Sequence, residues 1–189
     1  MGANMIMVFF GATTRAGVNS GTGTSLTLTP QDAEQIARQC PAVLEVAPLG
    51  RARAQIVYGN RNWVPEQIFG TTPSFLVVRD WQHLEQGEMF TDTDVRNANK
   101  VCVIGKTVQR NLFPDESPVG KEIRVNNVTF RIVGLLRPKG ANMMGIDQDN
   151  IVLAPWTTIK YRVSARRLPT PIKAPVLPVV PLQAAVSIR

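Results

Sequence analysis

The clearest alternation of apolar and polar positions lies between residues 100 and 138. Val101–Ile104 is a short apolar run, typical of a buried strand. Lys106–Phe113 then carries its apolar residues on one side of a helix. Pro114 ends that helix, because proline has no amide hydrogen and disfavours a helical residue before it.

A β-hairpin is predicted immediately after this helix. Charged and polar residues alternate with five apolar positions, Ile123, Val125, Val128, Phe130 and Ile132. Asn126-Asn127 separates the two runs, and asparagine tolerates the left-handed backbone of a tight turn. The pattern predicts one apolar face against a core and one charged face toward water.

The first part of the chain predicts a strand, a loop and a helix. Asn4–Phe10 is the expected strand, and Gly11–Ser25 is rich in Gly, Thr, Ser and Asn, which predicts a loop. Thr29 is a good N-cap, followed by proline at the first helical position. The helix has its apolar face at Ala33, Ile36, Ala37 and Cys40. Pro41 ends it.

Extended segments follow this helix. Val43–Pro48 and Arg51–Tyr58 predict strands, and Gly59-Asn60 predicts a turn before a return strand that ends at Phe69. Residues 73–84 fit either a short helix or an extended crossing.

The remaining segments alternate loops with short elements. Thr91–Lys100 and Lys139–Asn150 are polar and predict loops, the first containing Asp92, Asp94, Asn97 and Asn99. Ile151–Leu153 predicts a short strand, and Pro155–Thr158 predicts a final helical turn or two.

Composition indicates a globular chain. The 189 residues are 44% hydrophobic and 19% charged, enough for a true core. No apolar run reaches the roughly 18 residues of a spanning helix. Whatever anchors or exports the chain is therefore expected to lie outside it. The net charge of +7 allows attraction to phosphate or to an acidic protein surface.

Two segments resemble ligand-binding motifs superficially. Gly105-Lys106-Thr107 follows a strand, as the end of a P-loop does, but the required earlier glycine is replaced by Lys100. Helix initiation is the predicted role. Asp147-Gln148-Asp149-Asn150 offers oxygen atoms, yet no glutamate follows to complete a calcium loop. A turn before a strand is predicted there.

No catalytic constellation emerges from the remaining reactive residues. Asp92 and Asp94 are expected to be solvated carboxylates of a polar loop, not an acid–base pair. His83 is the only histidine, and no serine stands in a G-x-S-x-G context. We expect a half-buried ring without catalytic duty at His83. One histidine and two separated cysteines cannot form a usual zinc site. Cys102 is expected to be a small core residue, and spacing leaves open whether it pairs with Cys40.

The basic residues are scattered along the chain. They include Arg51, Arg53, Arg61, Arg79, Arg96, Arg110, Arg124, Arg131 and Arg137. Their alternation with apolar positions is typical of a solvated sheet face. Nucleic-acid binding would need interleaved aromatics or a known motif, so no nucleic-acid partner is predicted. Contact with a protein explains an arginine-bearing sheet at least as well.

Three stretches, taken in order, resemble the extracytoplasmic domain of the macrolide-exporter permease (MacB) family. They are VCVIGKTVQRNLF, SPVGKEIRVNNVTFRIVGLLRPKG and DQDNIVLAPWTT. GANMIMV and LTPQDAEQIA at the start are similar too, so the resemblance covers residues 2–163. It implies an α+β, two-lobed domain with mixed β-sheets and short helices. Residues 1–57 would form a membrane-proximal lobe and residues 58–163 an inserted distal lobe.

The resemblance also implies a function without catalysis. Such a domain sits between two membrane helices of an ABC transporter permease, on the periplasmic side of the inner membrane. It would couple ATP-driven motion to a periplasmic adaptor or a substrate, and the full transporter could be a dimer. No catalytic, cofactor-binding or metal-binding residue carries over, and ATPase activity would reside in a separate cytoplasmic part. The alternative is a free-standing periplasmic module that binds a small or lipidic ligand.

Residues 164–189 depart from this resemblance. Prolines at 169, 171, 175, 178 and 181 favour extended conformations and prevent a continuous helix. Three interpretations stay open for this tail: a truncation scar, a shifted reading frame, or a divergent return strand in Leu182–Ile188.

Overall fold

The computed structural model describes residues 5–8, 14–15, 18–19, 29–81, 83–142, 145, 147–163 and 182–188. Most of the loop predicted over residues 11–25 lies outside this range, as do residues 164–181 and 189 of the tail predicted over residues 164–189.

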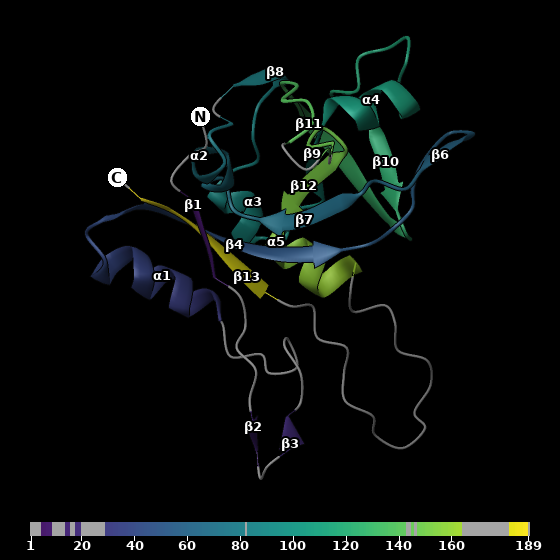
Figure 1. Ribbon diagram of the computed structural model, residues 1–189. Coiled ribbons are helices and arrows are strands. Elements are labelled where there is room, and N and C mark those ends of the chain that lie inside the picture. The colour runs from purple at the N-terminus through teal and green to yellow at the C-terminus, as the bar shows by residue number, and fades with distance from the viewer. Residues whose placement is uncertain are drawn as a thin grey trace.

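Within the described residues, eleven strands form one mixed sheet (Figure 1). Ten of them lie side by side in the order β1 (Met5–Val8), β13 (Leu182–Ile188), β4 (Val43–Ala52), β7 (Gln67–Thr71), β12 (Ile151–Pro155), β9 (Val101–Ile104), β11 (Val128–Leu136), β10 (Glu122–Val125), β5 (Ile56–Tyr58) and β6 (Arg61–Trp63). Strand β8 (Leu84–Gly87) pairs with β11 outside this path, and β2 (Thr14–Arg15) pairs separately with β3 (Val18–Asn19).

Short helices connect the strands. They are α1 (Pro30–Gln39), α2 (Phe75–Val78), α3 (Asp92–Arg96), α4 (Lys106–Leu112), α5 (Trp156–Thr158) and the π-helix η1 (Ile159–Val163). Their mixture with parallel and antiparallel strand pairs confirms the predicted α+β class.

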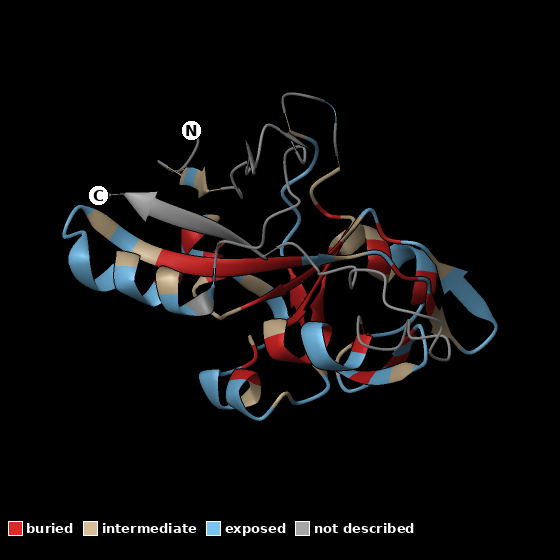
Figure 2. Cartoon of the chain, turned by 90° about the horizontal axis from the view of Figure 1, so that it is seen from below, coloured by how far each residue is buried: buried red, intermediate tan, exposed pale blue. Residues whose placement is uncertain are grey.

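The central strands are covered on both faces. Along β12, Val152 and Ala154 join a core with α4 and η1, while Ile151 and Leu153 join a second core with α2 and α3. All five residues of β12 are consequently buried, as expected of a strand with helices on both sides. Figure 2 shows these buried strands at the centre of the molecule.

Helix α1 packs against β4, near the end of the sheet formed by β1 and β13. Ala33 on α1 and Val46 on β4 are the buried pair of a small third core. Thr29 caps the helix, accepting a hydrogen bond from the amide of Asp32 while the Asp32 carboxylate accepts from the Thr29 amide, so both form a capping box. The outer side of α1 faces solvent (Figure 2).

The predicted hairpin and both flanking elements are confirmed. β10 and β11 pair antiparallel with Val125 opposite Val128, and Asn126 at the turn has a φ of 53°. Arg124 and Arg131 point outward between buried neighbours, as the alternation predicts. Strand β9 and helix α4 lie within a residue of their predicted bounds.

Three predictions about the strands and loops were wrong. The predicted strand Val43–Pro48 continues through Pro48 to Ala52 as β4, and the predicted strand Arg51–Tyr58 is divided between the end of β4 and β5. Strand β7 pairs with β4 only at Gly50–Ala52, so at Pro48 the strand has a partner on one side and the missing N–H is tolerated. The polar stretch after Thr91 contains helix α3, and the predicted loop over residues 11–25 contains the two-residue strands β2 and β3.

Two questions left open by the sequence are answered. Residues 75–78 form the short helix α2, not an extended crossing. Residues 182–188 form strand β13, which pairs with both β1 and β4 and so matches the return-strand interpretation of the tail. The division into lobes at residues 57 and 58 stays a prediction.

Candidate functional site

The segment that resembles a P-loop end is occupied by its own chain. Helix α4 begins at Lys106 after Gly105, as predicted, and Lys106 Nζ lies 2.5 Å from Glu85 Oε1. Thr107 Oγ1 donates a hydrogen bond of 2.6 Å to Asp147. A Cβ added to Gly105 would lie 2.2 Å from the carbonyl oxygen of Asp149. The backbone of the acidic turn therefore fills the place where a phosphate would approach.

The acidic turn likewise uses its own carboxylates. Asp149 is buried and accepts hydrogen bonds from the amides of Lys139 at 2.7 Å and Gly140 at 3.0 Å. Asp147 accepts from the amide of Asp149 at 2.8 Å in addition to the Thr107 hydroxyl. These contacts hold the turn before β12 in place, which agrees with the predicted role.

Asp94 caps helix α3, contrary to the loop predicted for this segment. Its carboxylate accepts from the side chain of Asn99 at 2.7 Å and from the Thr91 amide at 2.8 Å. These hydrogen bonds, that of Asn99 first, lower the pKa of Asp94 below its ordinary value of 3.8. Asp92, in the first turn of α3, is exposed. The two carboxylates have separate surroundings and do not form an acid–base pair.

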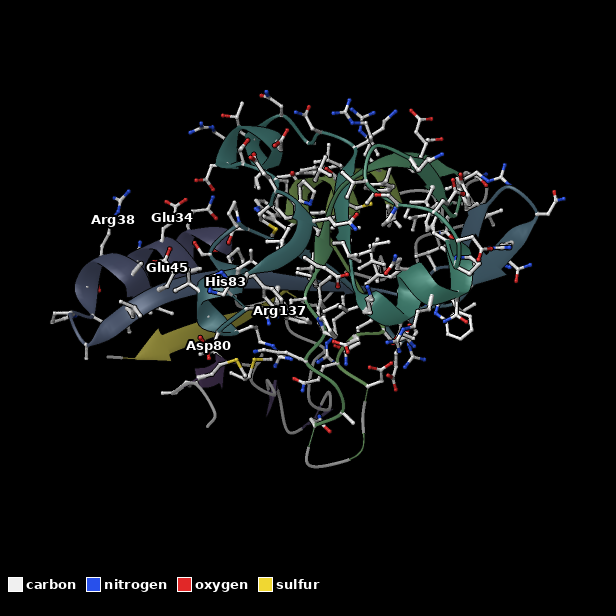
Figure 3. The ribbon with its side chains drawn as sticks, turned by 90° about the horizontal axis from the view of Figure 1, so that it is seen from above. Glu34, Arg38, Glu45, Asp80, His83 and Arg137 are labelled. Carbon is white, nitrogen blue, oxygen red and sulfur yellow. The ribbon has the colours of Figure 1, made fainter. Side chains whose placement is uncertain are left out.

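His83 is exposed, so the prediction of a half-buried ring was wrong. Trp81, two residues earlier, points into the core instead. It is 3% exposed, and its Nε1 donates a hydrogen bond of 2.7 Å to the carbonyl oxygen of Arg137. Figure 3 shows His83 on the same side of the view as Asp80 and Arg137, with Glu34 and Arg38 of α1 further out. No hydrogen bond joins His83 to another described residue.

Both cysteines are free. Cys40 is exposed at the end of α1, and Cys102 is buried in β9, as predicted for a core residue. Burial raises the pKa of the Cys102 thiol. The question of a disulfide between them is thus answered in the negative.

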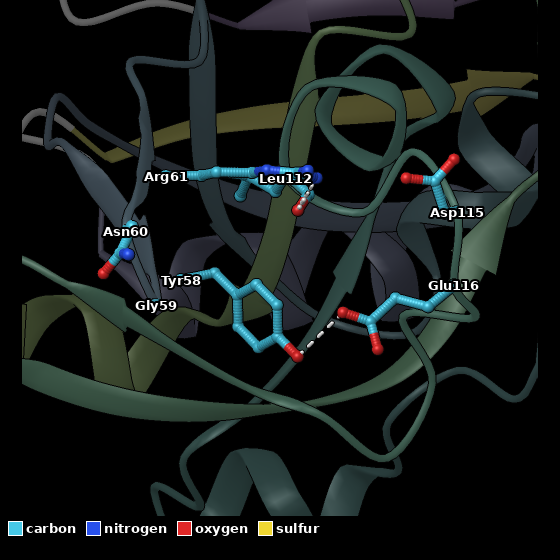
Figure 4. Close-up of a pocket in the computed structure, with 7 residues that line it drawn as sticks. All are labelled: Tyr58, Gly59, Asn60, Arg61, Leu112, Asp115 and Glu116. Atoms are coloured by element: carbon cyan, nitrogen blue, oxygen red, sulfur yellow. Dashed lines mark hydrogen bonds between the residues drawn. The ribbon is translucent and has the colours of Figure 1, made fainter.

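Polar hollows mark the far end of the sheet. One of ≈ 360 Å³ lies between the β5–β6 turn and the segment after α4 (Figure 4). Within it Tyr58 donates a hydrogen bond of 3.0 Å to Glu116, and Arg61 donates to the carbonyl oxygen of Leu112 at 3.3 Å. Glu116 also pairs with Lys121 at 2.9 Å, so its charge is already balanced.

A second hollow of ≈ 460 Å³ lies beside the β10–β11 turn. Its charged lining consists of Arg53, Arg124 and Arg162. Its charge and polar lining suit contact with an acidic surface more than enclosure of an apolar ligand.

Neither a metal cluster nor a spanning helix is found in the part of the chain that the structure describes. No group of three or more His, Cys, Asp or Glu side chains converges among those residues. Their helices are also too short or too polar to cross a membrane.

The fold defines the class of protein. The structure superimposes on the crystal structure of the periplasmic region of MacB from Actinobacillus actinomycetemcomitans with a TM-score of 0.72 and 21% identity, covering 99% of this chain and 75% of that one. It also matches the extracellular domain of the ABC-type transporter YknZ from Gram-positive bacteria, with a TM-score of 0.69 and 16% identity over 98% of this chain and 83% of that one. The chain thus has the fold of these two extracytoplasmic domains.

Sequence comparison defines the family. Residues 1–184 match the profile of the MacB-like periplasmic core domain, and the chain belongs to this family. It is 54% identical over 168 residues to a macrolide export ATP-binding/permease protein MacB of Syntrophobacter fumaroxidans and 44% identical over 165 residues to one of Rhodopirellula baltica. These alignments cover 89% and 87% of this chain but 23% and 24% of the relatives, so the chain spans about a quarter of their length.

Proposed function

We propose that this chain is a non-catalytic coupling domain of a macrolide-exporter-type ABC transporter. It relays ATP-driven motion from the membrane and cytoplasmic parts of the transporter to a periplasmic adaptor or to the transported substrate. The adaptor, the tether to the inner membrane, the ATPase on a separate part and a dimeric full transporter all belong to this proposal.

The observation that carries the proposal is the pairing of β1 with β13. These strands are antiparallel, with Met5 opposite Ser187 and Val8 opposite Ala184. The start of β1 and the end of β13 therefore lie side by side, although they are far apart in the sequence (Figure 1). A domain inserted between two membrane helices needs this arrangement, because the chain must enter and leave at one place.

The sheet gives a continuous path from that place to the distal hairpin. Strand β4 pairs with β13 from Val43 to Gly50 and with β7 from Gly50 to Ala52. The path continues through β12, β9 and β11 to β10. Because its central strands are buried on both faces, a displacement at β1 and β13 moves the packed sheet and is not absorbed by a loop.

The state of the polar groups also supports a role without catalysis. The carboxylates and the lysine that resemble reactive groups in the sequence hold turns, caps and ion pairs. The polar hollows beside Tyr58 and beside Arg124 favour a surface for docking over an enclosed binding site.

Domain exchange tests the proposal. In the Syntrophobacter fumaroxidans relative, the matching segment would be replaced by this chain, with the relative's own segment reinserted through the same junctions as a control. We expect the chimera to export macrolide and to co-purify with the transporter's adaptor. A transporter without the segment should hydrolyse ATP but fail to export. Export at the control level without the segment would overturn the coupling role. Loss of ATP hydrolysis on removal of the segment would also overturn it, if the adaptor has no effect on that hydrolysis.

A further inference from the structure

A small pocket lies between β4, β7 and α2, on the sheet face opposite α4. Its volume is ≈ 120 Å³, and it is lined by Met7, Leu49, Arg51, Gln67, Phe69, Phe75, Arg79, Asn142 and Gln148. A cavity of about 150 Å³ holds a benzene ring, so this pocket encloses roughly five non-hydrogen atoms, enough for a carboxylate and the first carbons of its chain. Its lining combines two guanidinium groups with an aromatic wall.

Arg79 brings a poorly compensated charge to this pocket. The sequence suggested one of many solvated arginines, but Arg79 follows α2 and is partly buried. Its Nη2 donates a long hydrogen bond of 3.4 Å to the neutral amide of Gln148. Among the residues that the structure describes, no carboxylate lines the pocket. Burial lowers the pKa of Arg79. Arginine stays protonated in proteins, so no described lining residue supplies a counter-ion for this charge.

Two neighbouring cations add to the positive potential. The guanidinium of Arg51 lies 5.4 Å from the centroid of the Phe69 ring. Lys139 Nζ donates a hydrogen bond to the carbonyl oxygen of Arg79. Burial and then the charge of Arg79 lower the pKa of Lys139, while Asp80 acts in the opposite direction. A partly buried positive charge that is paired only with a neutral amide is costly, and an anion would lower that cost.

The opposite wall of the pocket is apolar. Phe75 is 1% exposed and Leu49 is 2% exposed, and the rings of Phe69 and Phe75 lie 5.9 Å apart. These side chains offer no hydrogen-bond donors to a second or third anionic oxygen. A carboxylate has two oxygens for the arginines and an apolar body for this wall, so it fits the pocket better than a phosphate does.

We propose that the pocket binds a small apolar carboxylate. The carboxylate accepts hydrogen bonds from Arg79 and Arg51, and the apolar body lies against Phe69, Phe75 and Met7. This site does not depend on the coupling role, because its evidence is confined to the pocket itself.

Three probes of matched design test the site on the 189-residue chain. Hexanoate carries both charge and apolar body, acetate only the charge, and 1-hexanol only the apolar body. Binding would be followed by NMR through the Arg79 Nε–Hε signal and the methyl signals of Leu49. We expect saturable shifts with hexanoate, and affinity lower by about tenfold or more for acetate and hexanol. Equal affinity of hexanoate and hexanol would overturn the role of charge. Equal affinity of hexanoate and acetate, or no saturable shift, would overturn the site.

Variants locate the charge. Arg79→Gln should weaken hexanoate binding by about tenfold to a hundredfold, since a charge-assisted hydrogen bond is lost. Arg38→Gln is the matched control, because Arg38 projects from α1 into solvent (Figure 3), and it should bind hexanoate like the wild type. Equal losses in both variants would refute the site. Urea unfolding of each variant checks that it folds, and if Arg79→Gln does not, the probe series on the wild type still decides.

Discussion

The buried hydroxyl of Thr158 donates a hydrogen bond of 2.8 Å to the carbonyl oxygen of Asn99. The next residue back, Thr157, donates one of 2.5 Å to the carbonyl oxygen of Val95. Together they attach α5 to the end of α3 and to the turn that follows it. The Val95 carbonyl also accepts from the amide of Ala98 at 3.3 Å, so the Thr157 hydroxyl is a second donor to it. Two elements about sixty residues apart in the sequence are thereby fixed to each other.

Thr158→Val should destabilise the domain by about 0.5–1.5 kcal/mol. Valine keeps the shape of threonine, so the loss comes from removing the hydrogen bond between the buried Thr158 hydroxyl and the Asn99 carbonyl oxygen. Urea unfolding followed by circular dichroism measures it. Thr129→Val, the same change at an exposed position of β11, should alter stability by less than about 0.5 kcal/mol. Equal effects of the two variants would show that the hydroxyl of Thr158 contributes nothing.

Gly105→Ala should be among the most damaging single changes. The new Cβ would lie 2.2 Å from the carbonyl oxygen of Asp149, which is itself held by the amide of Thr107 at 3.2 Å. We expect a loss of about 3 kcal/mol or more, because backbone on both sides must move. Gly59→Ala is the control. Gly59 has a φ of 53° and open space around it, so it should lose only about 1–2 kcal/mol. A loss at Gly105 no larger than at Gly59 would contradict the close contact.

Local patterns were sufficient to predict much of the fold. The β10–β11 hairpin and the start of α1 depend on neighbouring residues, namely the alternation around Asn126-Asn127 and the Thr29 cap. Helix α3 was missed although Thr91 and Asp94 form the same capping box as Thr29 and Asp32. The signal was present, but a helix of five residues has too little apolar periodicity to stand out from a polar loop.

Long-range pairing was not predictable from local pattern. Strand β4 continues through Pro48 because β7 reaches it only beyond that residue, and β13 forms from a proline-rich tail because β1 and β4 accept it between them. The small pocket depends on the same kind of information. Nothing near Arg79 in the sequence indicates that Arg51 and Phe69 lie beside it.

Asp94 should contribute to the acid sensitivity of the domain. Its pKa is lowered in the folded state by Asn99 and Thr91, so its stabilising contribution is present above the ordinary value of 3.8 and is lost as the pH falls through the folded pKa. Asp94→Asn should therefore show a flatter loss of stability between about pH 5 and about pH 2. Urea unfolding at several pH values measures the slope. Asp92→Asn, in the same helix but exposed, is the control. An unchanged slope in Asp94→Asn would show that the capping carboxylate does not contribute to the acid sensitivity of the domain.

The two cysteines should react with thiol reagents at very different rates. Cys40 is exposed and should be labelled in the native protein, whereas Cys102 is fully buried and burial raises its pKa, which disfavours the reactive thiolate. A chromogenic disulfide reagent should thus detect one thiol per chain before unfolding and two after it. Cys40→Ser should abolish the native reaction. Rapid native labelling in that variant would mean that β9 opens far more readily than its packing indicates.

Strand β13 offers the strictest test of how the sheet is closed between β1 and β4. Ala185 lies opposite Met7 on β1 and opposite Ala47 on β4, so the strand is paired on both sides at this residue. Ala185→Pro removes an amide hydrogen and restricts the backbone in the middle of a sheet, and it should destabilise the domain by about 3 kcal/mol or more. Ala185→Val is the control, since a β-branched residue is compatible with strand geometry. Hydrogen exchange should show the amides of β1 and of the first half of β4 losing protection in the proline variant, while β9 and β12 keep theirs. If the proline variant is as stable as the valine variant, residues 182–188 do not form the return strand and the insertion geometry loses its support.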